Sequence, residues 1–169
     1  EVMEVVRFYF SQPSLVGSVI EYCNQNAAKV FDATLTNPEL RALFELHLKK
    51  EYSIESLEFV DQAQEFQQLL EKQKSSLLTK KSTVAKKESN IYCMFIPERA
   101  PKELNIPGEI RKNVQDSIEN HKKKVESFEQ HAFALVLQHI KTMLISDSFM
   151  RFVRKEQFAS VASKLFLKS

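Results

Sequence analysis

The side chains best suited to chemistry lie in one stretch, from Glu51 to Phe59, which contains Tyr52, Ser53 and Glu55. The stretch joins two strongly patterned helical segments, so these hydroxyl and carboxylate groups stand at a turn. Carboxylates in pairs can serve acid–base catalysis, but in most charged helical proteins they form solvated faces. The role of this stretch therefore depends on what else the chain offers.

The sequence lacks the other groups that known catalytic centres need. Its two glycines, Gly17 and Gly108, are isolated, which excludes the glycine-rich loops that bind phosphates. The histidines form no pair at three or four residues, and neither Glu-x-x-His nor Gly-x-Ser-x-Gly occurs. We expect no enzyme active site, no metal and no cofactor, and we expect His47, His131 and His139 to be helix residues with a satisfied ring nitrogen.

The composition predicts one all-α domain. The chain has 169 residues, 43% of them hydrophobic and 27% charged, which is ordinary for a globular protein. The net charge of +2 is too small to indicate a nucleic-acid partner. We see no signal peptide and no apolar run long enough to cross a bilayer. Cys23 and Cys93 are predicted to be reduced thiols in apolar surroundings rather than a disulfide, as in intracellular proteins.

Hydrophobic residues recur at the three- and four-residue spacing of amphipathic helices in the first half of the chain. We expect Asn37 or Thr36 to cap the helix that starts at Pro38, and Ser53 to cap the next one. The predicted helices cover 1–12, Ser14 through Phe31, Pro38 to Lys50, and Ser53 to about Ser75.

The second half begins with a lysine-rich segment, 71–90, which predicts a solvated helix end and a loop, or contact with an anionic membrane surface. Its lysines are Lys72, Lys74, Lys80, Lys81, Lys86 and Lys87. After it we expect a short buried helix at 91–96 and a loop at 98–106. A surface helix should follow from about Pro107 to Lys124, and then a helix at 132–145 that is apolar nearly all round and therefore central. We expect a last core helix capped by Asp147 or Ser146, and a patterned tail through Phe158, Val161, Ala162 and Leu165. Ser127 and Gln130 form a capping box before the central helix.

Three pieces of the chain resemble the regulator of G-protein signalling (RGS) family, and they do so in the family's order and approximate spacing. The first is FELHLKKEYSIESLEF (44–59), similar to the family's Phe…Leu helix followed by Glu-Tyr-Ser-x-Glu-Asn. The second is IYCMFI (91–96) with APKELNI (100–106), and the third is DSFMRF (147–152). Together they cover about Phe31 to Phe158.

The resemblance implies a bundle of about nine helices. It divides the chain into an N-terminal helical extension over 1–30, the RGS domain over 31–158 and a C-terminal helix over 159–169. From their apolar stripes, we expect the helices before Phe31 and after Phe158 to pack together. The resemblance also implies a function. The chain would bind the switch regions of an activated Gα subunit, accelerate GTP hydrolysis and so terminate signalling, in the cytoplasm at the inner face of the plasma membrane.

Carried over by position, the resemblance implies a Gα-binding surface built from three turns between helices. Asn105 matches the family residue beside the catalytic glutamine of Gα, where an amide can both donate and accept hydrogen bonds. The other implied contacts are Tyr52, Ser53, Glu55, Ser56, Met143, Asp147, Ser148 and Arg151. Asp147 and Arg151 are four residues apart and can pair. The alternative is that Ser53, Asn105 and Asp147 are helix caps only.

The sequence departs from the family pattern at Ser56, which replaces an asparagine, at Val60, which replaces a tryptophan, and at Phe149, which replaces a tyrosine. These changes bear on the strength and selectivity of Gα binding more than on the fold. Two other functions stay open. One is an RGS-like interaction or scaffold module that does not activate GTP hydrolysis, and the other is a peripheral membrane-binding module that uses the lysine-rich segment.

Overall fold

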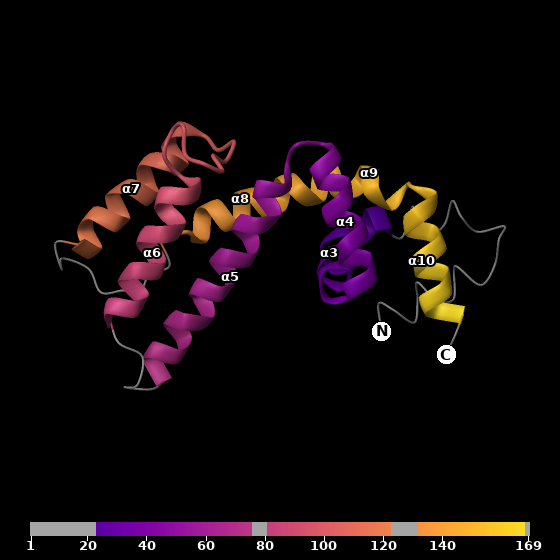
Figure 1. The fold of residues 1–169 in the computed structure, drawn as a ribbon, viewed down its shortest axis with the longest axis horizontal. Helices are drawn as coiled ribbons and strands as arrows, with labels where there is room; N and C mark the ends of the chain where they lie inside the picture. Colours follow the sequence, from indigo (N-terminus) through magenta and orange to yellow (C-terminus); the bar gives the residue numbers. More distant parts are fainter. Residues whose placement is uncertain (1–22, 76–80, 123–131, 168–169) are drawn as a thin grey trace. The chain divides into compact units, whose positions relative to one another are not determined.

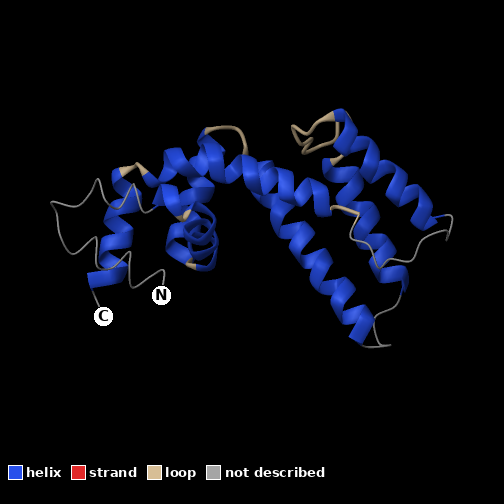
Figure 2. Ribbon diagram, turned by 180° about the vertical axis from the view of Figure 1, so that it is seen from behind, coloured by secondary structure: helices blue, strands red, loops and turns tan. Residues whose placement is uncertain are grey.

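The computed structural model describes residues 23–75, 81–122 and 132–167, with side chains described as far as Val161. Every regular element in these ranges is a helix, which confirms the all-α prediction (Figure 2). The predicted helix over 1–12 and the capping box at Ser127 and Gln130 lie outside the described residues, as does most of the N-terminal segment that was expected to pack against the C-terminal helix. No helix in the described ranges is long and apolar enough to span a membrane.

The described helices fall into two compact units. A terminal unit takes residues up to Ile54 and from Thr142 onward, and a central unit takes Glu55–Lys141. The elements, labelled in Figure 1, are α3 (Ala27–Thr36), α4 (Pro38–Lys50), α5 (Ile54–Ser75), α6 (Lys81–Phe95), α7 (Gly108–Lys122), α8 (Ala134–Leu144), the π-helical turn η2 (Ile145–Phe149), α9 (Met150–Val153) and α10 (Glu156–Leu167).

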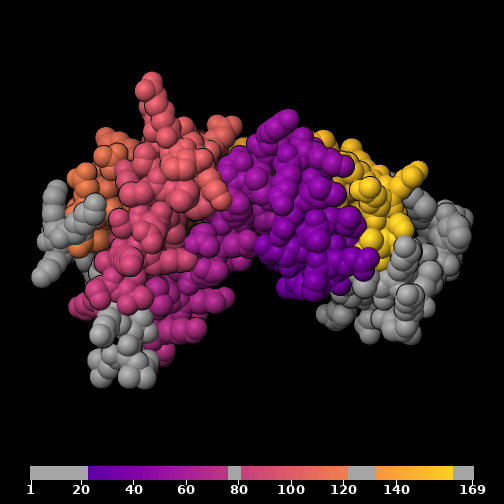
Figure 3. Space-filling model, in the orientation of Figure 1, coloured from indigo at the N-terminus to yellow at the C-terminus, as the bar shows by residue number. Residues whose placement is uncertain are grey.

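An aromatic cluster forms the core of the terminal unit. The rings of Phe31, Phe44 and Phe149 meet edge to face at centroid distances of 5.2–5.9 Å. Phe152 continues the cluster to Phe158 of α10 at 5.4 Å. Edge-to-face pairs contribute about 0.5–1.5 kcal/mol each beyond the area they bury. The cluster therefore holds α3, α4, α9 and α10 together, and α3 and α4 cover much of this unit on the face shown in Figure 3.

The start of α4 follows the prediction. The Asn37 side chain accepts hydrogen bonds from the backbone N–H groups of Glu39 and Leu40 at 3.1 and 3.0 Å, and Pro38 occupies the first helical position. These are two of the donors that a helix N-terminus leaves without intrahelical partners. The hydroxyl of Thr36 bonds back to the Ala33 carbonyl instead, so Asn37 alone is the cap.

The end of α4 is a Schellman turn with a tyrosine in the left-handed position. The N–H of Ser53 donates to the Leu48 carbonyl at 3.0 Å, and the N–H of Tyr52 donates to that of Lys49 at 3.3 Å. Tyr52 has φ of 53°, a conformation that usually falls to glycine. The turn ends one helix and starts the next within three residues, and it leaves the tyrosine side chain pointing away from both.

The central unit is built on α5, whose predicted stripe of Phe59, Ala63, Phe66 and Leu70 is buried as expected. Phe59 contacts Phe95 of α6 at 5.5 Å between ring centroids. Lys87 of α6 donates to two side chains of α5, those of Gln62 and Glu65, at 2.6 and 2.7 Å. Figures 1 and 2 show α6 running between α5 and α7.

The prediction of a loop up to residue 90 and a short helix at 91–96 was wrong. Residues 81–95 form the single helix α6, whose buried positions are Val84, Glu88, Ile91 and Phe95. This stripe is hard to recognise in the sequence because it includes Glu88, and a carboxylate is rarely a core residue. It is 3% exposed, and its Oε1 lies 2.7 Å from Nδ1 of His121, which is equally buried on α7.

Two further expectations concerned membrane binding by the lysine-rich segment and the state of the two cysteines. Lys80 lies outside the described residues, and membrane binding by this segment stays a prediction. Both described cysteines are free thiols, as expected, but Cys93 is exposed rather than apolar in its surroundings. Burial raises the pKa of the Cys23 thiol to about 11, so that group is inert at neutral pH.

The predictions for the segment after residue 132 need two corrections. Helix α8 is not apolar on all sides, because Leu135 and Met143 are 54% and 38% exposed. Its buried side chains, which include Ile140 and Leu144, keep to one stripe. Neither Ser146 nor Asp147 caps a new helix, because the backbone stays helical from α8 through η2 into α9.

Replacing Tyr52 by glycine should raise the free energy of unfolding by about 1 kcal/mol, because glycine adopts a positive φ without a steric cost. The side chain is 93% exposed, so little burial is lost. Denaturant unfolding would measure the gain. Tyr52→Ala is the matched control, since it removes the ring and keeps a Cβ at the same φ. Equal stability of the two variants would contradict the strain argument.

Candidate functional site

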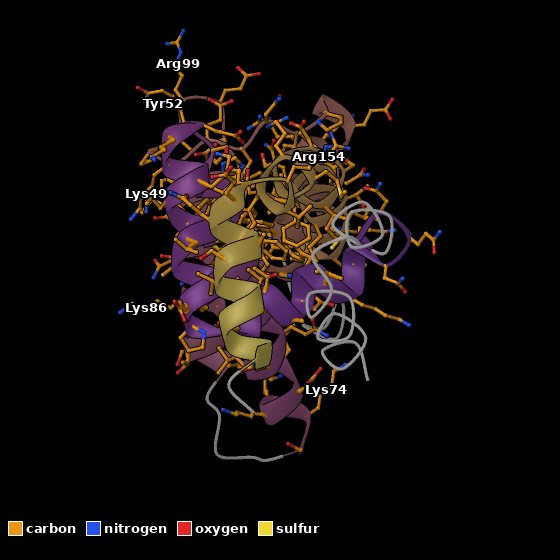
Figure 4. All side chains as sticks on the ribbon, turned by 90° about the vertical axis from the view of Figure 1, so that its right-hand side faces the viewer. Lys49, Tyr52, Lys74, Lys86, Arg99 and Arg154 are labelled. Atoms are coloured by element: carbon orange, nitrogen blue, oxygen red, sulfur yellow. The ribbon has the colours of Figure 1, made fainter. Side chains whose placement is uncertain are left out.

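The turn between α4 and α5 presents the first group of candidate residues. Tyr52 projects from the end of α4 into solvent (Figure 4). Glu55 and Ser56 lie half-buried in the first turn of α5, where the helix dipole favours a carboxylate. Ser53 precedes the helix as predicted, but its Oγ is buried and has no hydrogen-bond partner among the described residues, so it does not act as the expected cap.

Asn105 lies on the α6–α7 loop, between two buried anchors. Leu104 and Ile106 are 1% and 7% exposed, whereas Asn105 is exposed. Helix α7 begins three residues later at Gly108, and the Asn105 amide makes no hydrogen bond to any described residue. The alternative that Asn105 caps α7 is therefore not supported. The chain fixes the backbone on both sides of this residue and leaves its amide available.

Backbone hydrogen bonds fold the loop back on the end of α6. The N–H groups of Lys102 and Leu104 each donate at 3.0 Å to the carbonyls of Met94 and Phe95, which the helix end leaves without partners. Arg99 has φ of 64°, and its N–H donates to a Glu103 carboxylate oxygen at 2.7 Å. The loop is thus as closely bonded as the helices that it joins.

Arg111 of α7 clamps the same loop, and sequence reasoning missed it. Its guanidinium donates to the carbonyls of Ile96 and Leu104, the latter at 3.2 Å, and to the Glu103 carboxylate at 3.1 Å. A planar guanidinium with five N–H donors is the side chain best able to bond several acceptors at once. Arg111 therefore fixes the residue immediately before Asn105.

An ion pair connects the Asn105 loop to α5. Lys102 lies 2.7 Å from Oε2 of Glu58, which is three residues after Glu55 on the same helix. A cavity of about 330 Å³ opens beside this pair, lined by Glu58, Asp61, Gln62, Asn90, Ile91, Met94, Phe95 and Lys102. The pair is partly exposed, so its contribution to stability is about 1 kcal/mol at most. Its effect is to hold the loop against the first turns of α5.

The third group of residues lies in and around the π turn. Asp147 and Arg151 are exposed, Ser148 is buried, and Met143 is partly exposed. The predicted pairing of Asp147 with Arg151 is confirmed. Arg151 also donates to Ser148 Oγ at 3.3 Å. Turns of π-helix are uncommon and often occur at functional sites.

Glu51, which the sequence analysis did not select, is the partner that joins two of the three pieces. Its two carboxylate oxygens accept hydrogen bonds from Nε and Nη2 of Arg151, both at 2.9 Å, across 100 residues of sequence. The Arg151 hydrogen bond lowers the pKa of Glu51 to about 2 against the opposing effect of burial, and a hydrogen bond with Ser148 lowers it further. The same contact raises the pKa of Arg151 further above its usual range. The pair stays charged at every physiological pH.

Each unit thus brings together part of the predicted set. In the terminal unit, the Glu51–Arg151 pair links the residue before Tyr52 to Asp147 and Ser148. In the central unit, the Lys102–Glu58 pair links the Asn105 loop to the helix that starts with Glu55 and Ser56. No cluster of metal-ligating side chains occurs within the described ranges. Both groups are polar and partly exposed.

Comparison with known proteins identifies the family. The sequence model of the family described as "Regulator of G protein signaling domain" matches residues 30–161, which is well over half of the chain. The chain belongs to the RGS family. Its helical architecture agrees with the RGS fold, which is an all-α bundle.

Curated relatives carry the same family name. "Regulator of G-protein signaling rgs-7" of Caenorhabditis elegans is 30% identical over 128 residues, which is 76% of this chain and 14% of that protein. "Regulator of G-protein signaling 16" of Mus musculus is 27% identical over 134 residues, 79% of this chain and 59% of that protein. "Regulator of G-protein signaling 8" of Danio rerio is 26% identical over 137 residues, 81% of this chain and 70% of that protein. The RGS chain described here thus spans only part of these relatives.

The departures of this RGS domain from the family pattern differ in where they lie. Val60 and Phe149 are both fully buried, so these substitutions alter the core and not the surface. Ser56 is half-buried in the first turn of α5, where its side chain can reach solvent. Of the three changes, Ser56 is the one placed to alter a contact with a partner directly.

The variant Glu51→Gln should lower the free energy of unfolding by about 1 kcal/mol at neutral pH, since a partly exposed ion pair contributes that order of stability. The folded-state pKa of about 2 lies below the ordinary 4.5, so Glu51 stabilises the fold above pH 4.5 and loses this effect as the pH falls toward 2. Urea unfolding of both proteins between pH 7 and 2 would measure this.

The wild-type and Glu51→Gln stabilities should accordingly converge at low pH. Glu45→Gln is the control, because Glu45 forms a comparable pair with Arg41 inside the single helix α4 at 3.0 Å. Its effect should be a few tenths of a kcal/mol. A constant difference between wild type and Glu51→Gln across the whole pH range would refute the role of the Glu51 charge.

Proposed function

We propose that this RGS domain binds the activated form of a heterotrimeric G-protein α subunit and accelerates its GTP hydrolysis, so that the signal ends. The observation that carries the proposal is the exposed Asn105 amide on a loop fixed by Arg111. An exposed amide on a fixed backbone, with no bond to any described residue, is available to donate to one partner group and accept from another. Membership of the RGS family supports Gα as the partner of such a surface.

The proposed mechanism needs no chemistry from this chain. Gα supplies its own magnesium, a cis arginine and the glutamine that orients the attacking water. A partner that binds best to the transition-state arrangement of the switch regions lowers the barrier through differential binding. Each tenfold acceleration requires about 1.4 kcal/mol of such binding. The chain would therefore be an activator of another protein's active site, and not an enzyme.

We assign the roles as follows. Asn105 bonds the Gα glutamine and the water through its amide. Glu55 and Ser56 face the first switch region from the first turn of α5, beside Tyr52 and Ser53. Met143, Asp147, Ser148 and Arg151 form the remaining contact, with Arg151 held in one orientation by Glu51. Pre-ordered side chains lose less conformational entropy on binding, which favours affinity.

The direct test is single-turnover hydrolysis of GTP by a panel of Gα subunits, with and without this chain. We expect faster hydrolysis by at least one member of the panel. Binding to Gα carrying GDP and aluminium fluoride, which mimics the transition state, should be tighter than binding to Gα with GDP alone. Equal binding to the two forms with no acceleration would leave a non-activating interaction module as the function.

Asn105→Ala should reduce the acceleration at least about tenfold, since a lost bond to the transition state costs about 1.4 kcal/mol per tenfold. Its melting temperature should stay that of the wild type, because the side chain is exposed and makes no bond within the described structure. Asn113→Ala, an exposed asparagine of α7, is the matched control and should keep full activity. Full activity of Asn105→Ala would rule out the assigned role.

A further inference from the structure

His47 occupies an unusual position for a core residue of α4. Its side chain is 3% exposed, and its ring stacks on that of Phe152 at 5.6 Å between centroids. Nδ1 lies 2.8 Å from Nζ of Lys155, and Nε2 lies 3.0 Å from the Ser148 carbonyl oxygen. Nε2 is also 3.4 Å from Oε1 of Glu51. Both ring nitrogens therefore have partners from other segments of the terminal unit.

The chemistry of these partners fixes the state of the ring. A lysine ammonium can only donate hydrogen bonds, so Nδ1 of His47 must accept. A backbone carbonyl can only accept, so Nε2 must carry the proton and donate to Ser148. The ring is consequently neutral, with its hydrogen on Nε2. Lys155 selects this tautomer, and the tautomer directs an N–H at the π turn.

The hydrogen bond reaches the same groups that hold the proposed Gα contact. Ser148 belongs to the π turn, directly after Asp147, and its Oγ accepts from Arg151. Glu51, the second group near Nε2, is the main partner of Arg151. The His47 ring thus lies behind the exposed residues and touches both elements that orient them.

We propose that His47, with its tautomer set by Lys155, is a positioning residue for the contact formed by Asp147, Ser148 and Arg151. The identity of the partner rests on the proposed function above. The ring holds the Ser148 carbonyl and the Glu51 carboxylate in fixed positions relative to each other, so that Arg151 presents one orientation to Gα. A buried polar ring that served packing alone would lose stability relative to an apolar one, because its desolvation would go uncompensated.

The first test requires no partner. Nitrogen-15 NMR of histidine-labelled protein near pH 7 should show the Nε2–H tautomer for His47, assigned by the signals missing from His47→Phe. In Lys155→Met the Nδ1 shift should move, because that nitrogen loses its donor. An Nδ1–H tautomer or a doubly protonated ring in the wild type would overturn the hydrogen-bond assignment.

The second test measures affinity for Gα carrying GDP and aluminium fluoride. His47→Phe keeps the aromatic ring and removes both hydrogen bonds, and it should weaken binding about fivefold, the size expected for one hydrogen bond. His47→Gln can still donate to Ser148 and should retain more affinity than His47→Phe. A role in packing alone predicts the opposite order, and finding that order would overturn the proposal.

A double-mutant cycle separates positioning from charge. Lys155→Met should weaken binding in the wild-type background and have no further effect beside His47→Phe. Arg154→Met, labelled in Figure 4, is the matched control: it removes the same charge from an adjacent exposed residue and should leave affinity unchanged. Additive effects of the His47 and Lys155 substitutions would overturn the proposal.

The binding measurements also separate this inference from the proposed function. If the wild-type chain binds no Gα, the proposed function fails and so does the Gα contact assigned here, whatever the tautomer. If Gα binding is strong and Asn105→Ala reduces acceleration while the His47 variants bind like the wild type, the proposed function stands and the positioning role is wrong.

Discussion

The structure depends on how it satisfies the backbone N–H and C=O groups that lose their hydrogen-bond partners where a helix ends or changes pitch. Inside a helix each carbonyl is bonded by the N–H four residues on, but the last carbonyls of α6 are not. The N–H groups of Lys102 and Leu104 bond the carbonyls of Met94 and Phe95 instead, and Arg111 bonds that of Ile96. In the π turn, His47 adds a side-chain bond to the Ser148 carbonyl. Such bonds fasten the turns to the helices beside them.

Hydrogen bonds and ion pairs from neighbouring segments also limit the positions of the exposed residues Asn105 and Arg151. Asn105 follows a residue whose carbonyl is clamped, and Arg151 is held by Glu51, Asp147 and Ser148 together. In neither unit does a single strong interaction position these residues. Partly exposed ion pairs contribute little stability each, but several of them converging on one side chain restrict its orientation. These contacts affect the orientation of the side chains more than the stability of the fold.

Local signals in the sequence were enough to predict much of the fold. The Asn37 cap, the end of α4 at Lys50 and the buried stripe of α5 all follow from interactions within a few residues. Resemblance in three short pieces was enough to identify the family. Pairings between distant segments were not accessible in this way: periodicity does not report that Glu51 meets Arg151, or that Lys155 meets His47. Glu88 misled for the same reason, since its burial depends on His121 from another helix.

The π turn has a consequence for which changes of length the chain can accept. Ile140 and Leu144, both buried, are four residues apart, whereas the next buried ring, Phe149, is five residues beyond Leu144. Ser148 and Phe152 continue the four-residue spacing from Leu144, and Phe149 and Val153 form a second buried row beside them. The buried side of the helix is therefore wider from η2 onward, while Asp147 and Arg151 stay exposed. Because each residue turns an α-helix by about 100°, deleting any single residue between Ile145 and Phe149 would rotate Phe152 and Val153 away from the positions they occupy in the core.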